Sequence, residues 1–526
     1  MKAIGLVLFN GDERVTWSHG PVYSIEYTTK ALLEVRTSIL NENIDYILFW
    51  DFKNKLPSNK ELEDVIKEKG TFWHIGSILG LKDKPSLIEI VQPTNMNNVR
   101  VDASISHSSW KVTFKGCLLE RNIFESVVLQ NYSNSLDIIG LDFGYNAMIL
   151  GAMPRFSKNL AMNVKHEINT KIRPKDELAF IKKNLDKKAF IWCYMIKVFS
   201  ISPYTFVRLM SLKRNKKNSA IKRRYNDNNL TTISEVQVSV VIATLNRYKV
   251  LQEELRELRE LVPSPKEIVI VDQTPVKERN STFLEEFSDL SIQYITTEKI
   301  GQCSARNTGI KAAEGNYIWF LDDDMKEFPK DYLSRHLKTL QEYNADVSCG
   351  IPDEVGTDFM DRSTKHVFLS DGFPTNDVVV RKDLLENVDG FDEAMDQLQS
   401  EDQEIGLRLV KNGALSVKNN QLRLLHLRAP IGGLRTHKVR KSTFSASRKS
   451  VFKRRLLHYS EIYLSKKHFP RKNVFYLLLL NLRGTFIVRG NVFKKIIKII
   501  IGIILLVPTI FVLSRKNYLA NQMIKK

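Results

Sequence analysis

The sequence predicts an α/β protein, with a mostly parallel, Rossmann-like sheet in its C-terminal half, another α/β domain before it, and a basic helical tail. Short apolar runs alternate with stretches of helical periodicity, which is typical of strands and helices around a parallel sheet. Part of this pattern occurs twice, and basic residues gather at the C-terminus. The predicted domains are 1–165, 166–235, 236–435 and 436–526.

The first domain is expected to contain strands near Ala3–Phe9 and Tyr46–Trp50 and helices near residues 28–41 and 61–69. No apolar core with a cleavage site precedes the first strand, so we expect no export. The four cysteines are scattered without a C-x-x-C pair. This spacing argues against a disulfide framework or a thiolate metal site and fits a reducing cytoplasm.

Residues 166–235 are expected to connect the two α/β domains. Helical periodicity extends over Asp176–Leu212, and the run from Leu212 to Tyr225 is basic and polar. We interpret the basic run as a flexible, solvated linker, and contact with anionic lipid is the alternative.

The second domain is expected to alternate strands and helices from Val238 onward. Strands are predicted from Val238 (V-S-V-V-I-A-T), at Glu267–Val271 and at Ile292–Thr296, with helices from about Val250 and after Gly301. In such a sheet, the polar residues that follow successive parallel strands meet at one edge, where ligands bind.

The most informative strand of this domain is Tyr317–Leu321, because three carboxylates follow it directly: Asp322, Asp323 and Asp324. Adjacent anions repel one another unless a cation lies among them. Mg²⁺ or Mn²⁺, shared with the phosphates of a nucleotide, would satisfy the first and third carboxylates. A solvated acidic turn is the alternative interpretation.

Other polar residues are candidates for the same edge. Thr244, Asn246, Arg247 and Asp272 follow the first two strands, where a nucleoside would lie; each would also suit a turn or a helix cap. Arg306 and Asn307 stand near a helix start, where an arginine and backbone N–H groups can meet a pyrophosphate.

Further candidates follow these strands. Glu401 and Asp402 open a predicted helix, and one of them is a candidate general base for an acceptor hydroxyl. The alternative is that both only stabilise the helix N-terminus. His426 is a candidate metal ligand or phosphate contact, although a lone histidine also suits a structural role. Asp377 is a candidate for positioning acceptor or donor hydroxyls.

The order of motifs from Val238 to Arg435 resembles glycosyltransferase family 2, the inverting enzymes with the GT-A fold. The resemblance rests on V-S-V-V-I-A-T-L-N-R, I-V-I-V-D-Q-T-P, G-Q-C-S-A-R-N-T-G-I, F-L-D-D-D, V-D-G-F-D-E and S-E-D-Q-E-I-G-L-R-L. It implies a nucleotide-sugar donor, a divalent ion on Asp322 and Asp324, and Asp402 as the base; we assign Asp323 to the donor side. Gln273 stands where the family usually has a second acid, which leaves recognition of the donor base open.

The first domain contains a weak copy of the second. Tyr46–Asp51 matches Tyr317–Asp322, and Asp142-Phe-Gly-Tyr matches Glu404-Ile-Gly-Leu, with the same spacing to a Gly-Ala pair. However, Asp51-Phe-Lys replaces the three aspartates. We interpret residues 1–165 as a degenerate GT-A-like unit that serves structure or acceptor binding, with chance similarity as the alternative.

The tail from Thr436 onward has 21 Lys and Arg against the single acid Glu461, so it carries the whole net charge of +20. Two apolar runs, Val474–Leu482 and Ile496–Leu513, lie among these charges. The second is at the lower limit for a membrane span and is flanked by lysines and arginine, which favours a helix at the cytoplasmic leaflet over a single crossing. We expect an anionic membrane surface as partner, and no nucleic acid.

These expectations combine into a membrane-associated glycosyltransferase that adds one sugar to a glycan or polyprenyl-linked oligosaccharide acceptor in bacterial surface polysaccharide synthesis. Processive synthases that resemble this family carry a Q-x-x-R-W motif, whereas the last Trp here is Trp319. The alternative hypothesis is a non-catalytic scaffold that binds glycans or nucleotide sugars in an assembly complex.

Overall fold

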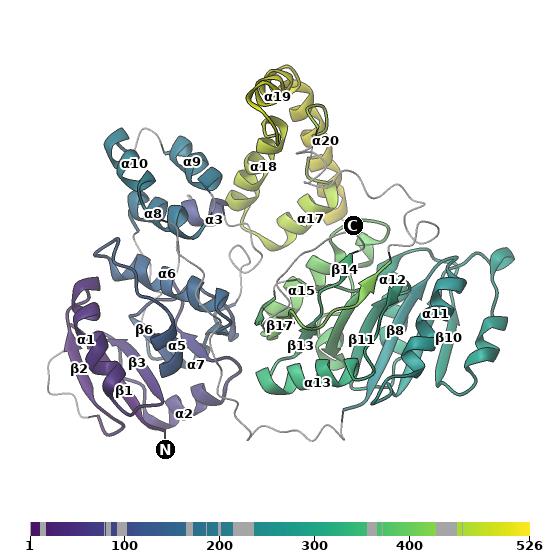
Figure 1. The fold of residues 1–526 in the computed structure, drawn as a ribbon, viewed down its shortest axis with the longest axis horizontal. Coiled ribbons are helices and arrows are strands. Elements are labelled where there is room, and N and C mark those ends of the chain that lie inside the picture. Colours follow the sequence, from purple (N-terminus) through teal and green to yellow (C-terminus); the bar gives the residue numbers. More distant parts are fainter. Residues whose placement is uncertain are drawn as a thin grey trace. The chain divides into compact units, whose positions relative to one another are not determined.

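The structure is a computed structural model. It describes residues 2–10, 17–77, 79, 86–91, 102–164, 172–185, 187–197, 201–213, 236–354, 366–370, 372–427, 450–454 and 456–525. The chain divides into two compact units. Unit 1 contains residues 1–227, 366–369 and 410–415, and unit 2 contains residues 228–365, 370–409 and 416–526 (Figure 1).

Unit 1 is built on a mixed sheet with the strand order β2-β1-β3-β6-β4-β7-β5. The strands are β1 Ile4–Phe9, β2 Val22–Ile25, β3 Tyr46–Asp51, β4 Phe72–His74, β5 His107–Ser108, β6 Gly116–Glu120 and β7 Pro154–Phe156. The helices are α1 Thr29–Asn41, α2 Asn59–Lys67, α3 Leu87–Val91, α5 Arg121–Ser126, α6 Leu136–Ile149 and α7 Lys158–Ala161. The predicted first strands and helices of this unit are therefore confirmed to within a few residues.

The described part of the connector contains three helices, which confirms the helical periodicity predicted over Asp176–Leu212. The helices are α8 Pro174–Asn184, α9 Lys187–Ile196 and α10 Pro203–Met210. Pro203 begins α10 because proline has no N–H to donate, and the Ser202 side chain accepts a hydrogen bond from the Thr205 N–H. The predicted basic linker lies outside the described residues from position 214 onward.

Unit 2 contains the predicted largely parallel sheet, with strands in the order β10-β9-β8-β11-β16-β13-β17. They are β8 Val238–Thr244, β9 Glu267–Asp272, β10 Ile292–Thr296, β11 Tyr317–Asp322, β13 Val347–Cys349, β16 Asp377–Arg381 and β17 Ser416–Asn419. The helices are α11 Tyr248–Arg259, α12 Gln302–Ala312, α13 Tyr332–Tyr343, α14 Lys382–Glu386 and α15 Glu401–Lys411. Helix α12 packs on β8 and β9, and α13 packs on β13 (Figure 1).

The central strand β11 is apolar because it is covered on both faces. Ile318, Trp319 and Phe320 have no exposed surface. β11 pairs with β8 in parallel and with β16 antiparallel, so its backbone is bonded on both edges. A small second sheet, β12 Met325–Lys326, β18 Leu425–His426 and β14 Asp353–Glu354, follows the end of β11 in the order β12-β18-β14.

The two sheets have corresponding strand pairings. In unit 1, β1 and β3 are parallel, β3 and β6 antiparallel, β6 and β4 antiparallel, and β4 and β7 parallel. In unit 2, the same sequence of pairings links β8, β11, β16, β13 and β17. The segments matched by sequence, Tyr46–Asp51 and Tyr317–Asp322, are the central strands β3 and β11 of this pattern. Unit 1 is therefore an α/β domain whose central strands are connected in the same way as those of unit 2.

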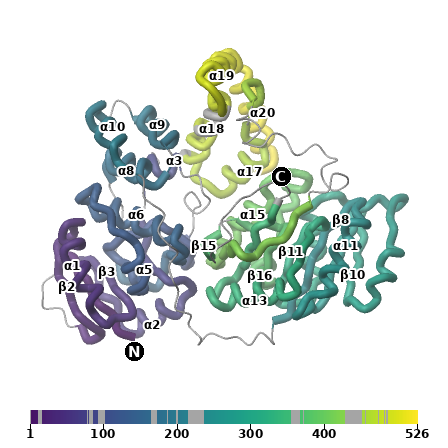
Figure 2. Tube along the Cα trace, viewed as in Figure 1, coloured from purple at the N-terminus to yellow at the C-terminus, as the bar shows by residue number. Residues whose placement is uncertain are grey.

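The tail forms helices α17 Tyr459–His468, α18 Arg471–Phe486, α19 Val492–Ile504 and α20 Leu506–Lys525 (Figure 2). Helix α17 packs against α20, and α18 packs against α19. The apolar run predicted at Ile496–Leu513 is divided between α19 and α20, whose axes differ by 61°. Within the described part of the chain no helix is by itself long and apolar enough to cross a membrane, although this bent pair would be if taken together.

Candidate active site

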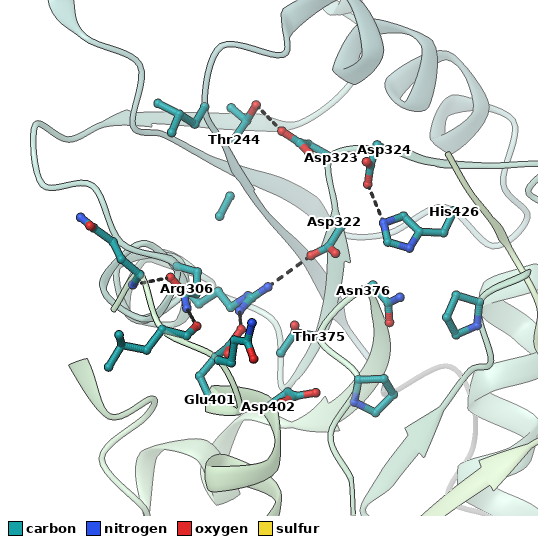
Figure 3. A pocket seen from close by; sticks show the side chains of 18 of the residues that line it. Thr244, Arg306, Asp322, Asp323, Asp324, Thr375, Asn376, Glu401, Asp402 and His426 are labelled. Carbon is teal, nitrogen blue, oxygen red and sulfur yellow. Dashed lines mark hydrogen bonds and ion pairs between the residues drawn. The ribbon is translucent and has the colours of Figure 1, made fainter. Parts of the chain in front are cut away.

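A cavity of about 520 Å³ opens at the edge of the unit 2 sheet where β8 and β11 end. It is lined by Ala243, Thr244, Leu245, Arg247, Gln273, Gln302, Arg306, Asp322, Asp323, Asp324, Pro352, Pro374, Thr375, Asn376, residues 397–402, Lys418 and His426 (Figure 3). The polar residues that follow parallel strands meet here, as the strand pattern predicted.

Asp322 is the last residue of β11 and lies opposite Ala243 of β8. Its Oδ1 is 3.2 Å from Nη2 of Arg306, and Nη1 of the same arginine is 3.5 Å from Glu401 Oε1. Figure 3 shows the guanidinium between the two carboxylates. One cation from α12 thus links the end of the central strand to the first residue of α15. About a third of the Asp322 side chain is exposed.

Asp323 is buried and faces β8. It accepts hydrogen bonds from the Thr244 hydroxyl at 2.8 Å and from Arg247 Nη1 at 2.6 Å. Burial raises the pKa of Asp323 to about 6, with Asp324 adding to the rise and Arg247 opposing it. Asp323 is therefore held by the protein itself, in the wall of the cavity.

Asp324 faces His426, with 3.1 Å between Oδ1 and Nε2 (Figure 3). The pairing of β12 with β18 places His426 opposite Met325, the residue after Asp324. One ligand atom from each of Asp322, Asp324 and His426 lies within 4.8 Å of the others. Two carboxylates and an imidazole suit a divalent ion such as Mn²⁺, and carboxylates alone suit Mg²⁺. The residues present therefore fit the predicted metal.

Glu401 and Asp402 begin α15 and enter the cavity from the side facing Arg306 (Figure 3). Burial raises the pKa of Glu401 to about 7, and the neighbouring Asp402 adds to the rise while Arg306 opposes it. Burial also raises the pKa of Asp402. A carboxyl group with a pKa of about 7, as at Glu401, can hold or release a proton near neutral pH.

The predicted residues that line the cavity are Thr244, Arg247, Arg306, Asp322, Asp323, Asp324, Glu401, Asp402 and His426. Four predicted residues, Asn246, Asp272, Asn307 and Asp377, do not line the cavity.

Asp377 was predicted to position sugar hydroxyls, but it has no exposed surface. Its carboxylate accepts hydrogen bonds from Trp319 Nε1 at 3.0 Å and the Tyr332 hydroxyl at 2.6 Å, and lies 3.1 Å from His336 Nε2. Asp377 therefore joins β16 to the buried side of β11 and α13. Asn307 is likewise structural: its amide group bonds the Phe391 backbone N–H at 2.7 Å and C=O at 2.9 Å.

Asp272 and Asn246 lie after the predicted strands but point away from the cavity. Asp272 is fully buried and accepts bonds from the hydroxyls of Tyr248 at 2.7 Å and Tyr294 at 2.5 Å. Asn246 donates to Glu278 at 2.7 Å. Gln273, named above as a departure from the family pattern, lines the cavity instead.

Sequence reasoning missed Thr375 and Asn376, which line the cavity just before β16. β16 runs antiparallel to β11, so the residues before β16 lie at the same edge as the residues after β11. The prediction considered only the ends of parallel strands and selected the neighbouring Asp377.

Part of unit 2 is similar in sequence to a known protein family. Residues 239–392 match the family model described as Glycosyl transferase family 2. Glycosyltransferase GlyA of Streptococcus pneumoniae is 30% identical over 116 residues, covering 22% of this chain and 16% of GlyA. The uncharacterized glycosyltransferase EpsJ of Bacillus subtilis is 30% identical over 155 residues, covering 29% of this chain and 42% of EpsJ. The chain thus spans well under two thirds of these relatives.

Solved structures with similar regions include residues 1–349 of S. aureus TarS in complex with UDP-GlcNAc, with 16% identity and a TM-score of 0.36 over 48% of this chain and 72% of that fragment. Another is the mannosyltransferase PcManGT from Pyrobaculum calidifontis with GDP-Man and Mn²⁺, with 14% identity and a TM-score of 0.37 over 57% of this chain and 84% of PcManGT. Residues 239–392 of this chain, which lie in unit 2 apart from 366–369, thus match glycosyltransferase family 2.

Proposed function

We propose that the protein is a metal-dependent, inverting glycosyltransferase that moves one sugar from a nucleotide-sugar donor to a glycan acceptor. The observation that carries this proposal is the arrangement of the cavity. A group able to hold a divalent ion (Asp322, Asp324 and His426) and a carboxyl pair with raised pKa values (Glu401 and Asp402) line one space.

In inverting transfer the acceptor attacks one face of the anomeric carbon while the nucleotide leaves from the opposite face. The enzyme therefore needs a positive charge beside the leaving diphosphate and a base beside the acceptor. A divalent ion held by Asp322, Asp324 and His426 would supply Lewis-acid stabilisation of the diphosphate. Arg247 and Arg306 add fixed positive charge at the same edge.

In the transfer step, the acceptor oxygen forms a bond to the anomeric carbon as the bond from that carbon to the diphosphate oxygen breaks. The acceptor hydroxyl proton passes to the carboxylate pair, of which we assign Asp402 as the base and Glu401 as its neighbour. Raised pKa values suit this role, since they increase the proton affinity of the base near the working pH.

We further propose a lipid-linked acceptor, as in the assembly of bacterial surface polysaccharides, and a location at the cytoplasmic face of the membrane. Support comes from the tail, where the exposed basic residues are Lys495 on α19 and Arg515 and Lys525 on α20. The same two helices expose large apolar side chains: Val492, Phe493, Ile496, Ile500, Ile503 and Ile504 on α19, and Val507, Ile510 and Phe511 on α20. Such a surface suits an anionic bilayer interface. Flotation with anionic vesicles, and no retention on DNA, is the expected result.

The activity is tested with purified full-length protein and a panel of UDP-, GDP- and dTDP-sugars, with Mn²⁺, with Mg²⁺ or with a chelator. We expect one donor to raise the melting temperature, and a ligand at about 100 times its dissociation constant adds about 2.7 kcal/mol to the free energy of unfolding. The same donor should be hydrolysed or transferred only with the metal. Donor binding without any turnover under these conditions would favour the non-catalytic scaffold.

A further inference from the structure

One wall of the cavity is formed by residues 392–404, which we call the wall segment. It contains the short 3₁₀ helix Glu393–Met395 and the start of α15, and residues 397–402 line the cavity. Two of its non-glycine residues have left-handed backbone angles, Gln397 with φ 58° and Ser400 with φ 74°. Such conformations are strained for residues other than glycine and persist only when the surroundings hold them.

The first end of the wall segment is held by the tail helix α17. Asp392 accepts a hydrogen bond from the Tyr463 hydroxyl at 2.7 Å and an ion-paired bond from Lys467 Nζ at 2.6 Å. The other oxygen of Asp392 accepts from the Ala394 N–H at 3.0 Å and so caps the 3₁₀ helix. Burial would raise the pKa of Asp392, but the bonds from Lys467 and Tyr463 lower it below its ordinary value.

The second end is held by the same helix. Glu404, one turn after Glu401 and Asp402, has no exposed surface. It lies 2.9 Å from Lys467 Nζ, 3.1 Å from His468 Nε2 and 2.6 Å from Arg408 Nη2. Burial would raise the pKa of Glu404, but His468, Arg408 and Lys467 hold it well below its ordinary value. Glu404 is thus a buried carboxylate that pairs with Arg408 of its own helix and with Lys467 and His468 of the tail.

We propose that α17 is a positioning element of the active site, in which Lys467 bridges Asp392 and Glu404 and thereby holds both ends of the wall segment. Tyr463 and Lys467, one turn apart on α17, contact Asp392 at the first end of the wall segment. Lys467 and His468 contact Glu404 at its second end. Because residues 397–402 lie between the two held ends, this bridge sets where Glu401 and Asp402 stand in the cavity. Lys467 acts through these residues and is a positioning residue. Only the effect on turnover rests on the proposed function.

Unit 1 has a related arrangement that is built on hydrogen bonds. Asp142 of α6 accepts a hydrogen bond at 2.6 Å from Asn184 of α8. Ser133, which precedes α6, donates a hydrogen bond at 3.0 Å to Asp176 of α8. Asp142 is the residue that the sequence match aligns with Glu404. In both units, a helix that follows the sheet contacts the corresponding acidic residue: α8 contacts Asp142, and α17 contacts Glu404. In unit 2 this contact is the Lys467 bridge, which lies near the candidate base Asp402.

The bridge is tested first without any activity measurement, by amide hydrogen exchange in the full-length protein. Lys467→Met is expected to speed exchange in peptides covering residues 393–404 by about tenfold, and Lys467→Arg should restore protection. The control is Lys466→Met on the same helix, whose side chain bonds Asn521 at 2.5 Å and which should leave this segment unchanged. Unchanged exchange in Lys467→Met would overturn the proposal.

If Lys467→Met does not fold, Tyr463→Phe provides the same test, because it removes one hydroxyl bond to Asp392 and keeps the packing of the ring. Its expected effect is smaller, about threefold faster exchange in residues 393–404. Wild-type exchange in this variant would then overturn the proposal.

The kinetic consequence is measured with the donor found in the panel above. Lys467→Met should lower kcat about tenfold, with the Kd of the donor within about twofold of wild type, and Lys467→Arg should recover most of kcat. An equal loss of donor affinity and turnover, or no loss of kcat, would overturn the positioning role. If wild-type protein shows no turnover, the proposed function fails, while the exchange experiment still decides whether the bridge holds the wall segment.

Discussion

The two sheets of this protein share their strand pairings but differ at the end of the central strand. In unit 1, Asp51 of β3 is followed by an exposed Phe52 and by Lys53, whose N–H donates to Asp51 at 3.1 Å. That aspartate therefore closes a turn. In unit 2, β11 is followed by carboxylates that face Arg247, Arg306 and His426. The shared fold therefore gives both units a sheet edge at the end of the central strand. In the ranges that the structure describes, only unit 2 has side chains from several strands and helices that form a candidate site at that edge.

The helix before the last parallel strand shows a second contrast between the units. Burial raises the pKa of Asp142 on α6 to about 6, and its neutral hydrogen-bond partners Asn184 and Tyr132, together with the charge of Lys183, only partly oppose this. Burial would raise the pKa of the equally buried Glu404 on α15, but the hydrogen bonds from His468, Arg408 and Lys467 hold this pKa well below its ordinary value. A buried carboxyl group with neutral hydrogen-bond partners thus has a raised pKa, whereas one that is paired with cations has a lowered pKa.

The largest expected effect comes from removing the carboxylates that distinguish unit 2. Asp322→Asn or Asp324→Asn should lower metal-dependent transfer about a thousandfold, because the leaving diphosphate loses several kcal/mol of charge stabilisation. Mn²⁺ binding, measured by calorimetry, should weaken in parallel. Asp51→Asn, at the corresponding place in unit 1, is the matched control and should transfer sugar at the wild-type rate. Full activity in both unit 2 variants would remove the metal assignment.

Asp402→Asn should lower kcat by about a hundredfold or more, the usual loss when a general base is removed. In wild-type protein the acid limb of the rate profile should lie near pH 7, because the pair must be deprotonated to accept a proton and the pKa of Glu401 is raised to about 7. Glu401→Gln removes the adjacent like charge and should move this limb to lower pH. A wild-type profile that is flat from pH 5 to 8 would contradict the role of the pair.

A stability prediction tests the contrast between the two buried acids. Glu404→Gln should lower the free energy of unfolding of unit 2 by about 3–5 kcal/mol at pH 7, because it leaves Arg408, Lys467 and His468 facing a neutral group. Asp142→Asn should cost less than about 1 kcal/mol, since its hydrogen-bond partners are neutral. Thermal unfolding of the two variants checks this, and equal losses would remove the distinction.

The same two acids should give opposite dependences of stability on pH. The lowered pKa of Glu404 contributes stability above its unfolded pKa, and this is lost as the pH falls. The raised pKa of Asp142 contributes stability below its unfolded value, which is lost as the pH rises through about 6. Asp142→Asn should therefore flatten the decline between pH 4 and 6. A decline of wild-type size in this variant would show that another group causes it.

The smallest effect is expected from rebuilding the acidic turn in unit 1 with Phe52→Asp and Lys53→Asp. Among the described residues, only Asp322, Asp324 and His426 form a group of this kind that could hold an ion. The double variant should therefore change Mn²⁺ stoichiometry and affinity by less than about twofold. Binding of a second ion would show that three consecutive aspartates after a strand are sufficient.

Much of unit 2 could be predicted because its strands combine apolar runs with polar residues directly after them. β8, β10 and β11 begin where expected, and Asp322–Asp324 lie in the cavity. The side-chain direction at a strand end is harder to predict, because it depends on which neighbours are packed against it. Asp272 turns toward two tyrosines and Asp377 toward β11 and α13, and neither contact leaves a local pattern in the sequence.

By itself, the sequence determined the α/β class, the repeated order of elements, the acidic end of the central strand and the basic, apolar character of the tail. These features depend on residue types over short distances, which a linear pattern records. Only the tertiary structure decided that Thr375 and Asn376 enter the cavity while Asp377 does not, and that Lys467 reaches Asp392 and Glu404. Such contacts join residues far apart in the chain, and they are selected by packing and charge pairing in three dimensions.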